Sequence, residues 1–173
     1  MGAYNLYFST KPAFFSKRIA LSYYKAIIAG IKNHYPSEGD LLKQIGRESL
    51  KYINFEQSEK SKKQLKGMRG NPIIKLYFEV FRKFYPSFDL LQPNIKIYEP
   101  EIQNSGKKAV YRFTNSEFLE DSEDFIYHFY IIAGIIEKQF SDLFNRVIKC
   151  NIEKVNISDT QGESFIDISL TVE

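Results

Sequence analysis

The sequence predicts an α+β domain with helices packed on a four-stranded antiparallel sheet. Apolar residues recur every three or four positions through residues 12–53, 72–85 and 122–144, which is the spacing of helices. Four segments after residue 93 alternate apolar and polar residues, which is the spacing of half-buried strands. The predicted order is three helices, a β-hairpin, one long helix and a second β-hairpin.

The first predicted helix spans residues 12–35. Pro12 suits its first turn, and Pro36 ends it. We expect one face of this helix to turn toward the core, because apolar or small residues repeat along it at helical spacing. They are Phe15, Ile19, Ser22, Tyr23, Ala26, Ile27, Gly30 and Ile31.

Two more helices are predicted in the N-terminal half. Ser37 can cap the second, whose apolar stripe runs from Leu41 to Ile53. Gly46 in its middle costs about 1 kcal/mol relative to Ala, so it indicates either a closely approaching backbone or a tolerated weak spot. The third helix spans residues 72–85, and its predicted buried face is Ile73, Leu76, Tyr77, Val80, Phe81 and Phe84.

The C-terminal half predicts two hairpins around the long helix. Residues 94–99 and 108–114 alternate on either side of turn chemistry at 104–106. Ser122 can cap the long helix, and the acidic residues that follow suit the positive end of its dipole. Strands at 146–157 and 164–172 complete the sheet, with inward residues Ile148, Cys150, Ile152, Ile166, Ile168, Leu170 and Val172.

Length and composition set further limits. A chain of 173 residues fits one domain, with a helical part at 1–88 and a hairpin–helix–hairpin part at 93–173. Hydrophobic residues make up 43%, too many for a disordered chain. No apolar run reaches the roughly 18 residues of a membrane span, and no signal layout is present, so we expect a cytoplasmic protein without integral membrane association. One Cys and two His allow neither an internal disulfide nor a Cys-built metal site.

Charge and aromatic residues are unevenly distributed. The net charge is only +3, yet residues 1–87 hold 16 Lys and Arg against 6 Asp and Glu, and residues 88–173 hold 8 against 15. Such separation favours ordered contacts between molecules, or an anionic partner for the helical half. The chain also has 15 Phe and 12 Tyr but no Trp, which predicts a bulky core, an exposed apolar face or a lined cavity.

Two stretches carry a family resemblance. The helix at 125–140, FIYHFYIIAGIIEKQF, leads into strands at 147–155 and 164–172. This arrangement resembles the ligand-binding fold of heme nitric-oxide-binding domains, 4-vinyl-reductase-type domains and TRAPP vesicle-tethering subunits. Within that group, YPSEGDLLKQIGR at 35–47 and the Gly-Asn-Pro at 70–72 are similar to an uncharacterised bacterial family found chiefly in Myxococcales. The resemblance covers about residues 37–173 and implies ligand binding, sensing or signalling, or membership of a protein complex.

The same resemblance argues against heme. Heme-binding members carry a proximal His on the helix before the first hairpin, and residues 72–85 contain no His. Those members also hold the heme propionates with Tyr-x-Ser-x-Arg, of which residues 111–115 keep only Tyr111. Because heme needs an axial ligand from the protein, we expect no heme, and no other cofactor is indicated.

Candidate catalytic groups are few. His128 lies one helical turn after Asp124, so the two could form a general base with its orienting carboxylate, or an ordinary surface pair beside the core stripe. His34 suits a capping role at the end of its helix. Cys150 alternates inward with apolar residues, which favours a buried small hydrophobe over a nucleophile. No phosphate loop or nucleophile elbow is present, so we predict no enzyme activity.

Two binding sites are predicted instead. The basic segment 60–69 is either a solvated loop or an anion site built from Lys62, Lys63, Lys66 and Arg69. Nucleic acid is not expected there, because the segment between Phe55 and Tyr77 offers no aromatic residue for base stacking. The interior between helices and sheet is either a packed core or a cavity, lined by Tyr77, Phe78, Phe81, Tyr111, Phe129 and Gly134.

Two hypotheses for function follow. The first is a non-enzymatic sensor or binding domain that holds a small apolar ligand or an acyl chain without heme. The alternative is an interaction or scaffold subunit whose first helices form a homodimer or partner face. The pentapeptide Ile-Ile-Ala-Gly-Ile, at 27–31 and again at 131–135, is either a chance repeat or a sign that two helices cross at their glycines.

Overall fold

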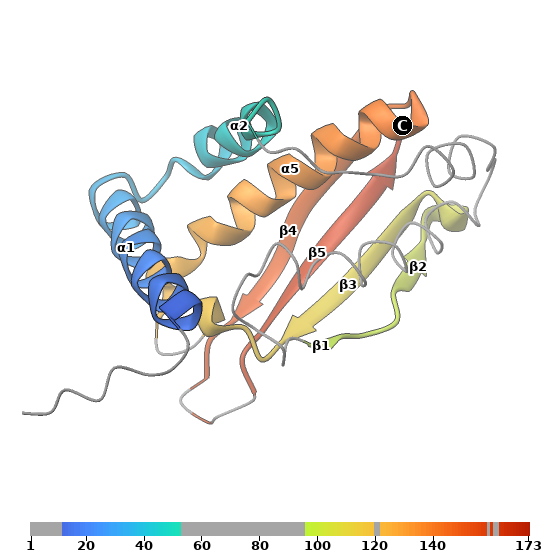
Figure 1. The fold of residues 1–173 in the computed structure, drawn as a ribbon. Helices are drawn as coiled ribbons and strands as arrows, with labels where there is room; N and C mark the ends of the chain where they lie inside the picture. The colour runs from blue at the N-terminus through green and yellow to red at the C-terminus, as the bar shows by residue number, and fades with distance from the viewer. Residues whose placement is uncertain (1–11, 53–95, 120–121, 159, 161–162) are drawn as a thin grey trace, which may run out of the picture.

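An antiparallel sheet forms one layer of the computed structural model, which describes residues 12–52, 96–119, 122–158, 160 and 163–173 (Figure 1). Its strands are β1 (Lys96–Ile97), β2 (Glu101–Gln103), β3 (Lys108–Thr114), β4 (Ile148–Asn156) and β5 (Phe165–Val172). The order across the sheet is β1-β3-β5-β4, and β2 also pairs with β3. The predicted α+β class, with an antiparallel sheet covered by helices, is confirmed.

The first strand of the sheet differs from its prediction. Instead of one strand at 94–99, the structure has two short strands, β1 and β2, one after the other in the sequence. Both pair with β3. Lys96 is paired with Thr114, and Glu101 with Val110. Pro100 separates the two short strands, and a proline cannot donate a hydrogen bond to a ladder. The five strands therefore occupy the four positions that the sequence predicts.

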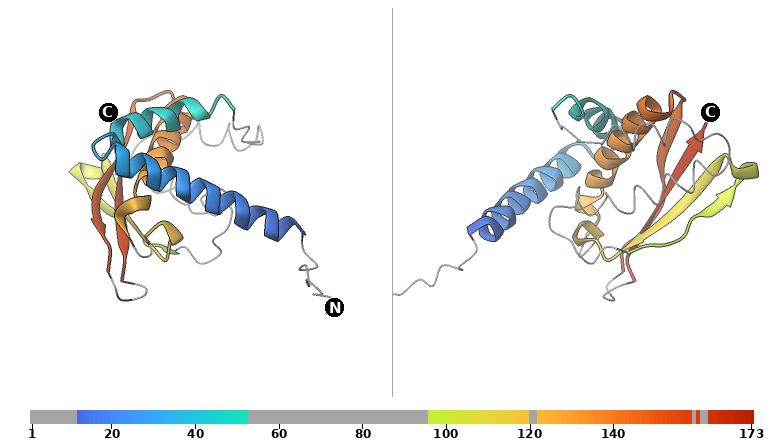
Figure 2. Two further views of the ribbon diagram at one scale, coloured as in Figure 1. Left: turned by 90° about the vertical axis from the view of Figure 1, so that its left-hand side faces the viewer. Right: turned by 45° about the vertical axis from the view of Figure 1, so that its right-hand side comes forward.

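Three α-helices of the described residues cover one face of the sheet (Figures 1 and 2). They are α1 (Pro12–His34), α2 (Gly39–Ser49) and α5 (Tyr127–Phe144). Helix α5 lies against the sheet, α2 packs on α5, and α1 lies outermost. None of the helices in the described ranges is long and apolar enough to cross a membrane. The third predicted helix, at 72–85, lies outside the described residues.

Short 3₁₀ turns lead into α5. They are η2 (Glu117–Leu119) and η3 (Glu123–Phe125), while η1 (Asn104–Gly106) forms the turn between β2 and β3. The Ser122 hydroxyl accepts a hydrogen bond from the Asp124 backbone N–H at 3.0 Å, so Ser122 caps the turn η3 and not the long helix, which begins at Tyr127. At the other end of α5, Asn145 adopts the left-handed conformation that commonly ends a helix.

The main core lies between α5 and the sheet. Tyr111 and Phe113 of β3 meet Phe129 of α5 there, and all three side chains are inaccessible to solvent. The inward residues predicted on β4 and β5 join them, because alternate residues of a strand point to one face. The buried members from these two strands are Ile148, Cys150, Ile166, Ile168 and Leu170.

The opposite face of the sheet is polar and tightly paired. Arg112 of β3 donates two hydrogen bonds to Asp167 of β5, at 2.8 and 2.7 Å. Glu153 in turn accepts a hydrogen bond from the Ser169 hydroxyl at 2.6 Å and pairs with Lys108 at 2.8 Å. These pairings satisfy the polar side chains that β5 turns away from the helices.

Helix α1 packs on the molecule with a different face from the one predicted. Its buried residue is Ile28, with Leu21, Tyr24 and Ile31 half-buried around it. These four positions form their own stripe at helical spacing, so α1 has two apolar faces and periodicity alone does not choose between them. The predicted core face is exposed, with accessible fractions of 43% at Ile19, 69% at Tyr23 and 59% at Ile27.

Candidate functional site

The described residues include part of the predicted ligand cavity. Tyr111 and Phe129 belong to one buried cluster between α5 and the sheet, so the structure brings these two residues together. Tyr77, Phe78 and Phe81 lie outside the described residues, as do the predicted anion-site residues Lys62, Lys63, Lys66 and Arg69. Both binding sites therefore stay predictions.

Gly134 contacts the backbone of a neighbouring helix. A Cβ atom at Gly134 would lie 1.9 Å from the Lys43 carbonyl oxygen of α2, and a Cβ at Gly46 would lie 2.0 Å from the Ile131 carbonyl oxygen of α5. Real Cβ atoms do not come this close to another atom, so the backbones of α2 and α5 can approach to this distance only because both positions are glycine. Gly134, which was predicted to line the interior, has the backbone of α2 as its neighbour, and Gly46 is likewise a site of close approach.

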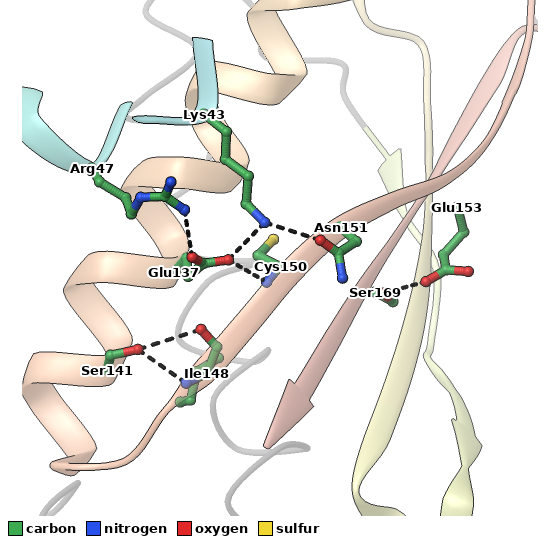
Figure 3. Close-up of polar contacts among 9 residues, drawn as sticks. All are labelled: Lys43, Arg47, Glu137, Ser141, Ile148, Cys150, Asn151, Glu153 and Ser169. Atoms are coloured by element: carbon green, nitrogen blue, oxygen red, sulfur yellow. Dashed lines mark hydrogen bonds and ion pairs between the residues drawn. The ribbon is translucent and has the colours of Figure 1, made fainter. Parts of the chain in front are cut away.

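A buried carboxylate, Glu137, ties α2, α5 and β4 together (Figure 3). Its two oxygens accept hydrogen bonds from Lys43 Nζ at 2.7 Å and from Arg47 Nη1 at 2.6 Å. The Cys150 backbone N–H of β4 donates to the same carboxylate at 3.0 Å. We call Glu137, Lys43, Arg47 and the Cys150 N–H the Glu137 junction.

Pairing keeps Glu137 ionised despite its burial. Burial raises the pKa of its carboxyl, but the hydrogen bonds from the two cations and from the strand outweigh that effect and hold the pKa below its ordinary value. Lys43 is itself buried and donates a further hydrogen bond to the Asn151 side chain at 2.9 Å. Every charge in the Glu137 junction therefore has a partner, as buried charges require.

Side chains of α5 also seal the open edge of the sheet. Among the described strands, β4 pairs with β5 alone, so the backbone N–H groups on its other side need other acceptors. The Ile148 N–H donates to the Ser141 hydroxyl at 3.0 Å, and the Cys150 N–H donates to Glu137, one helical turn earlier on α5 (Figure 3). Glu137 therefore has a structural role. In the sequence it is a single carboxylate within an apolar helix, and that pattern does not indicate the role. The weak signal was Lys43 and Arg47, two cations one helical turn apart on α2.

Cys150 is not placed for nucleophilic chemistry. Its side chain is fully buried under α5, and burial raises the pKa of the thiol far above its ordinary value. Lys43 lowers that pKa and Glu137 raises it, but both effects are smaller than burial. A thiol held in its neutral form is a weak nucleophile, which agrees with the predicted small hydrophobe.

His128 is buried, so the surface pair predicted with Asp124 is wrong. The Nδ1 atom is hydrogen-bonded to the Tyr24 hydroxyl of α1 at 3.0 Å, and the ring stacks on Phe118 with centroids 3.7 Å apart. Burial lowers the pKa of His128 to about 3. Its Nε2 atom has no hydrogen-bond partner among the residues that the structure describes. Helical spacing placed His128 off the main core stripe, but α1 covers that side of α5.

The outward side of α1 is uncharged. Its exposed residues include Ile19, Ala20, Tyr23, Ala26 and Ile27, and nothing lies within 4 Å of a Cβ built at half-exposed Gly30. We call these six residues the outer α1 face. Lys25 and Lys32 turn the other way, since Lys25 Nζ lies 4.6 Å from the Phe125 ring centre and Lys32 Nζ lies 5.5 Å from that of Tyr127.

No metal site is formed by the described part of the chain. Its His, Cys, Asp and Glu side chains nowhere gather in a group of three or more that could hold a metal ion. The groups with unusual environments are instead structural, at the Glu137 junction and at His128. Among the described residues, the outer α1 face is an apolar surface without a partner inside the molecule.

Comparisons with known proteins match the chain by structure alone. No family model and no curated protein matches the sequence. Among solved structures, the chain is similar to trafficking protein particle complex subunit 3 from Naegleria fowleri, covalently bound to palmitic acid, with a TM-score of 0.54 and 12% identity over 93% of this chain and 96% of that one. The chain has the fold of that TRAPP subunit.

Two H-NOX structures are more distant matches. A mutant from T. tengcongensis and a Cs H-NOX mutant that carries 4-cyano-L-phenylalanine have TM-scores of 0.44 and 0.45. Each is 12% identical over 85% of this chain and 70% of that protein. The Myxococcales-type resemblance stays a prediction.

Proposed function

We propose that this chain is a non-enzymatic scaffold subunit that binds a partner helix on the outer α1 face. The observation that carries the proposal is the exposure of Ile19, Tyr23 and Ile27 on one uncharged side of a helix. Contiguous apolar surface of this kind marks a protein interaction site. Large residues at i, i+4 and i+8, as here, also provide the anchors by which helices bind one another.

The positions of the candidate catalytic groups support a non-enzymatic role. His128 is enclosed by Tyr24 and Phe118, and its ring is uncharged near neutral pH. Cys150 is enclosed under α5 as a neutral thiol. Neither group reaches solvent where a substrate could meet it, and the fold is shared with a subunit of a larger complex.

A photo-crosslinking residue tests the scaffold proposal. It would replace Tyr23 or Ile27 in the cells that make the protein, with Lys138 on the exposed side of α5 as the matched control position. We expect ultraviolet light to join the chain to a protein from positions 23 and 27, and not from 138. Equal yields at all three positions, or no adduct at 23 and 27, would contradict the proposal.

A second candidate function is the binding of an acyl chain in the interior. The TRAPP subunit with the same fold is bound covalently to palmitic acid, and Tyr111 and Phe129 place aromatic rings between α5 and the sheet in this chain. The only cysteine, Cys150, is a buried neutral thiol, so we propose non-covalent binding of the acyl chain.

Native mass spectrometry with added palmitic acid tests the second candidate. We expect one palmitic acid per chain under gentle conditions and none after denaturation. A fatty acid of two carbons, acetate, is the control for non-specific adducts. An adduct that survives denaturation would contradict the non-covalent mode, and no adduct under either condition would contradict acyl binding.

A further inference from the structure

His128 uses one ring nitrogen inside the molecule and leaves the other without a partner. Its Nδ1 atom is hydrogen-bonded to the Tyr24 hydroxyl at 3.0 Å, so this side of the ring holds α1 against α5. Its Nε2 atom is buried and makes no hydrogen bond within the part of the chain that the structure describes. Folded proteins pair nearly all such atoms with protein groups or with bound molecules. The unpaired Nε2 therefore indicates a polar partner that is not a described residue.

The surroundings of His128 are apolar and continuous with the interior. Phe118 stacks on its ring with centroids 3.7 Å apart, and Phe129 lies edge-on to it with centroids 5.3 Å apart. Both phenylalanines belong to the buried cluster between α5 and the sheet, as does Tyr111. Apolar walls with one polar group at their margin are typical of a site for a molecule with an apolar chain and a polar end.

From this placement we infer that His128 Nε2 binds the carboxyl group of a fatty acid whose chain lies along Phe118 and Phe129 in the interior. The inference rests on acyl-chain binding, the second candidate function above, and names the residue that holds the polar end of the ligand. The enclosure of His128 suits a ligand that stays bound, whereas the substrate of an enzyme must enter and leave at every turnover.

Tyr24 and Phe118 fix the His128 ring before a ligand binds. When the Tyr24 hydroxyl donates to Nδ1, the proton of the neutral ring is on Nε2, which then donates a hydrogen bond to a ligand oxygen. Stacking on Phe118 sets the plane of the ring as well. A carboxyl oxygen therefore meets a donor that is already in position, which lowers the entropic cost of binding.

The fatty acid binds together with a proton. In water near neutral pH the acid is a carboxylate, because the ordinary pKa of a carboxyl group is about 4, and the buried His128 ring is uncharged. An unpaired negative charge is costly in an apolar interior, so one proton from water enters with the carboxylate. The bound pair is then neutral overall, whether the carboxyl group or the imidazole holds the proton. The affinity should therefore rise about tenfold for each pH unit by which the pH is lowered.

The charged groups of the elements around His128 do not replace this proton. On α1, Lys25 Nζ lies 5.7 Å from the Phe118 ring centre, but it already donates a hydrogen bond to the Glu117 backbone carbonyl at 3.0 Å. On α5, the first charged residue after His128 is Glu137. The charged side chains of η2 and η3 are acidic and would repel a carboxylate; they are Glu117, Glu123 and Asp124. Burial, and none of these charges, lowers the pKa of His128.

Titration calorimetry with dodecanoic acid tests the carboxyl contact and its proton. Titrations in two buffers of different ionisation enthalpy count the protons, and we expect one proton taken up per acid at pH 7.5 and about tenfold tighter binding at pH 6.5. His128→Phe keeps an aromatic ring against Phe118 and should weaken binding of the acid by at least about tenfold. 1-Dodecanol is the matched ligand without a carboxyl group. It should bind without proton uptake and lose about threefold or less in His128→Phe, and circular dichroism checks that this variant is folded.

Nitrogen-15 NMR of histidine-labelled protein tests the same contact in the native chain. The chain has two histidines, so the spectrum contains two rings, and His34→Gln assigns them. Dodecanoic acid should shift the Nε2 signal of His128 and leave the signals of His34 unchanged. This measurement and the proton count need no substitution at His128, so they decide the question even if His128→Phe does not fold.

The outcomes separate this inference from acyl-chain binding. Three results would overturn the carboxyl contact and leave acyl-chain binding standing: acid that binds without shifting His128, binding without proton uptake, or equal losses for the acid and the alcohol in folded His128→Phe. Failure of both dodecanoic acid and 1-dodecanol to bind the native chain would overturn acyl-chain binding as well.

Discussion

The two copies of the pentapeptide Ile-Ile-Ala-Gly-Ile have opposite environments. In α5, at 131–135, four of its five residues are buried, and Gly134 contacts the backbone of α2. In α1, at 27–31, only Ile28 is buried, Ile27 is exposed, and Gly30 has no neighbour at its Cβ position. Gly134 crosses α2 at Gly46, so the two pentapeptides do not cross each other.

This difference shows that a local sequence does not determine which of its faces is buried. Helix α5 has the sheet on one side and α2 on another, so nearly every residue of its copy of the pentapeptide contacts a neighbouring element. Helix α1 has the core on one side only, and the same apolar residues remain at the surface on the other. The exposed copy is therefore available for contacts between molecules, and the buried copy is not.

The largest expected difference is between substitutions of the two pentapeptide glycines, Gly134 and Gly30. Gly134→Ala puts a Cβ 1.9 Å from a backbone oxygen that cannot move alone, so we expect a loss of more than about 3 kcal/mol in the free energy of unfolding. Gly30→Ala meets nothing within 4 Å and should raise that free energy by about 0.5–1 kcal/mol through helix propensity. Urea unfolding of both variants measures the difference. Equal effects would show that α2 and α5 do not depend on close approach.

The second-largest difference in stability is expected between substitutions of two neighbouring isoleucines of α1, Ile28 and Ile27. Ile28 is 1% exposed, so Ile28→Ala removes buried methyl groups and should cost about 2–4 kcal/mol. Ile27→Ala removes exposed atoms and should change the free energy of unfolding by less than about 0.5 kcal/mol. Both are measured by urea unfolding at low protein concentration, where dimerisation contributes little. A large cost for Ile27→Ala in the monomer would place its side chain inside the molecule.

A smaller loss is expected at the Glu137 junction. Glu137→Gln keeps the shape but removes the charge that balances the buried Lys43, and it should cost about 2–3 kcal/mol. The matched control on the same helix is Asp142→Asn, which breaks an exposed pair with Lys138 and should cost less than about 0.5 kcal/mol. Urea unfolding at pH 7.5 compares the two. Similar costs for Glu137→Gln and Asp142→Asn would mean that burial does not strengthen the Glu137 junction.

Local signals in the sequence predicted the elements and their order. Pro12 begins α1, Pro36 lies two residues after its last residue, His34, and the alternation at 108–114 coincides with β3. Ser122 forms a cap, but on the short turn η3 that precedes α5 and not on α5 itself. These features are determined by residues close in sequence, so they can be predicted without knowledge of the tertiary fold.

Predictions that depend on packing were less successful. Two predictions were wrong for the same reason: which face of α1 is buried, and that His128 lies at the surface. Both depend on where α1 lies relative to α5. Gly46 and Gly134 each indicated that another backbone could approach closely. The sequence did not indicate that these two glycines lie at the same helix crossing. The Glu137 junction joins residues that are about 90 positions apart, which no local pattern reports.

The smallest expected effect is a pH dependence at the contact between α1 and α5. His128 has a pKa of about 3 when folded against an ordinary value of 6.5, so the fold favours the neutral ring. Above pH 6.5 both states are neutral and stability is complete. Below it the unfolded chain gains a proton first, and stability falls by about 1.4 kcal/mol per pH unit until the folded pKa is reached.

Urea unfolding between pH 7.5 and 5 measures this dependence, in a range above the ordinary pKa of the carboxyl groups. His128→Gln, which does not titrate, should remove a loss of about 2 kcal/mol between pH 6.5 and 5. If His128→Gln leaves the slope of stability against pH as it is in the native chain, the contact between Tyr24 and His128 does not hold α1 in a pH-dependent way.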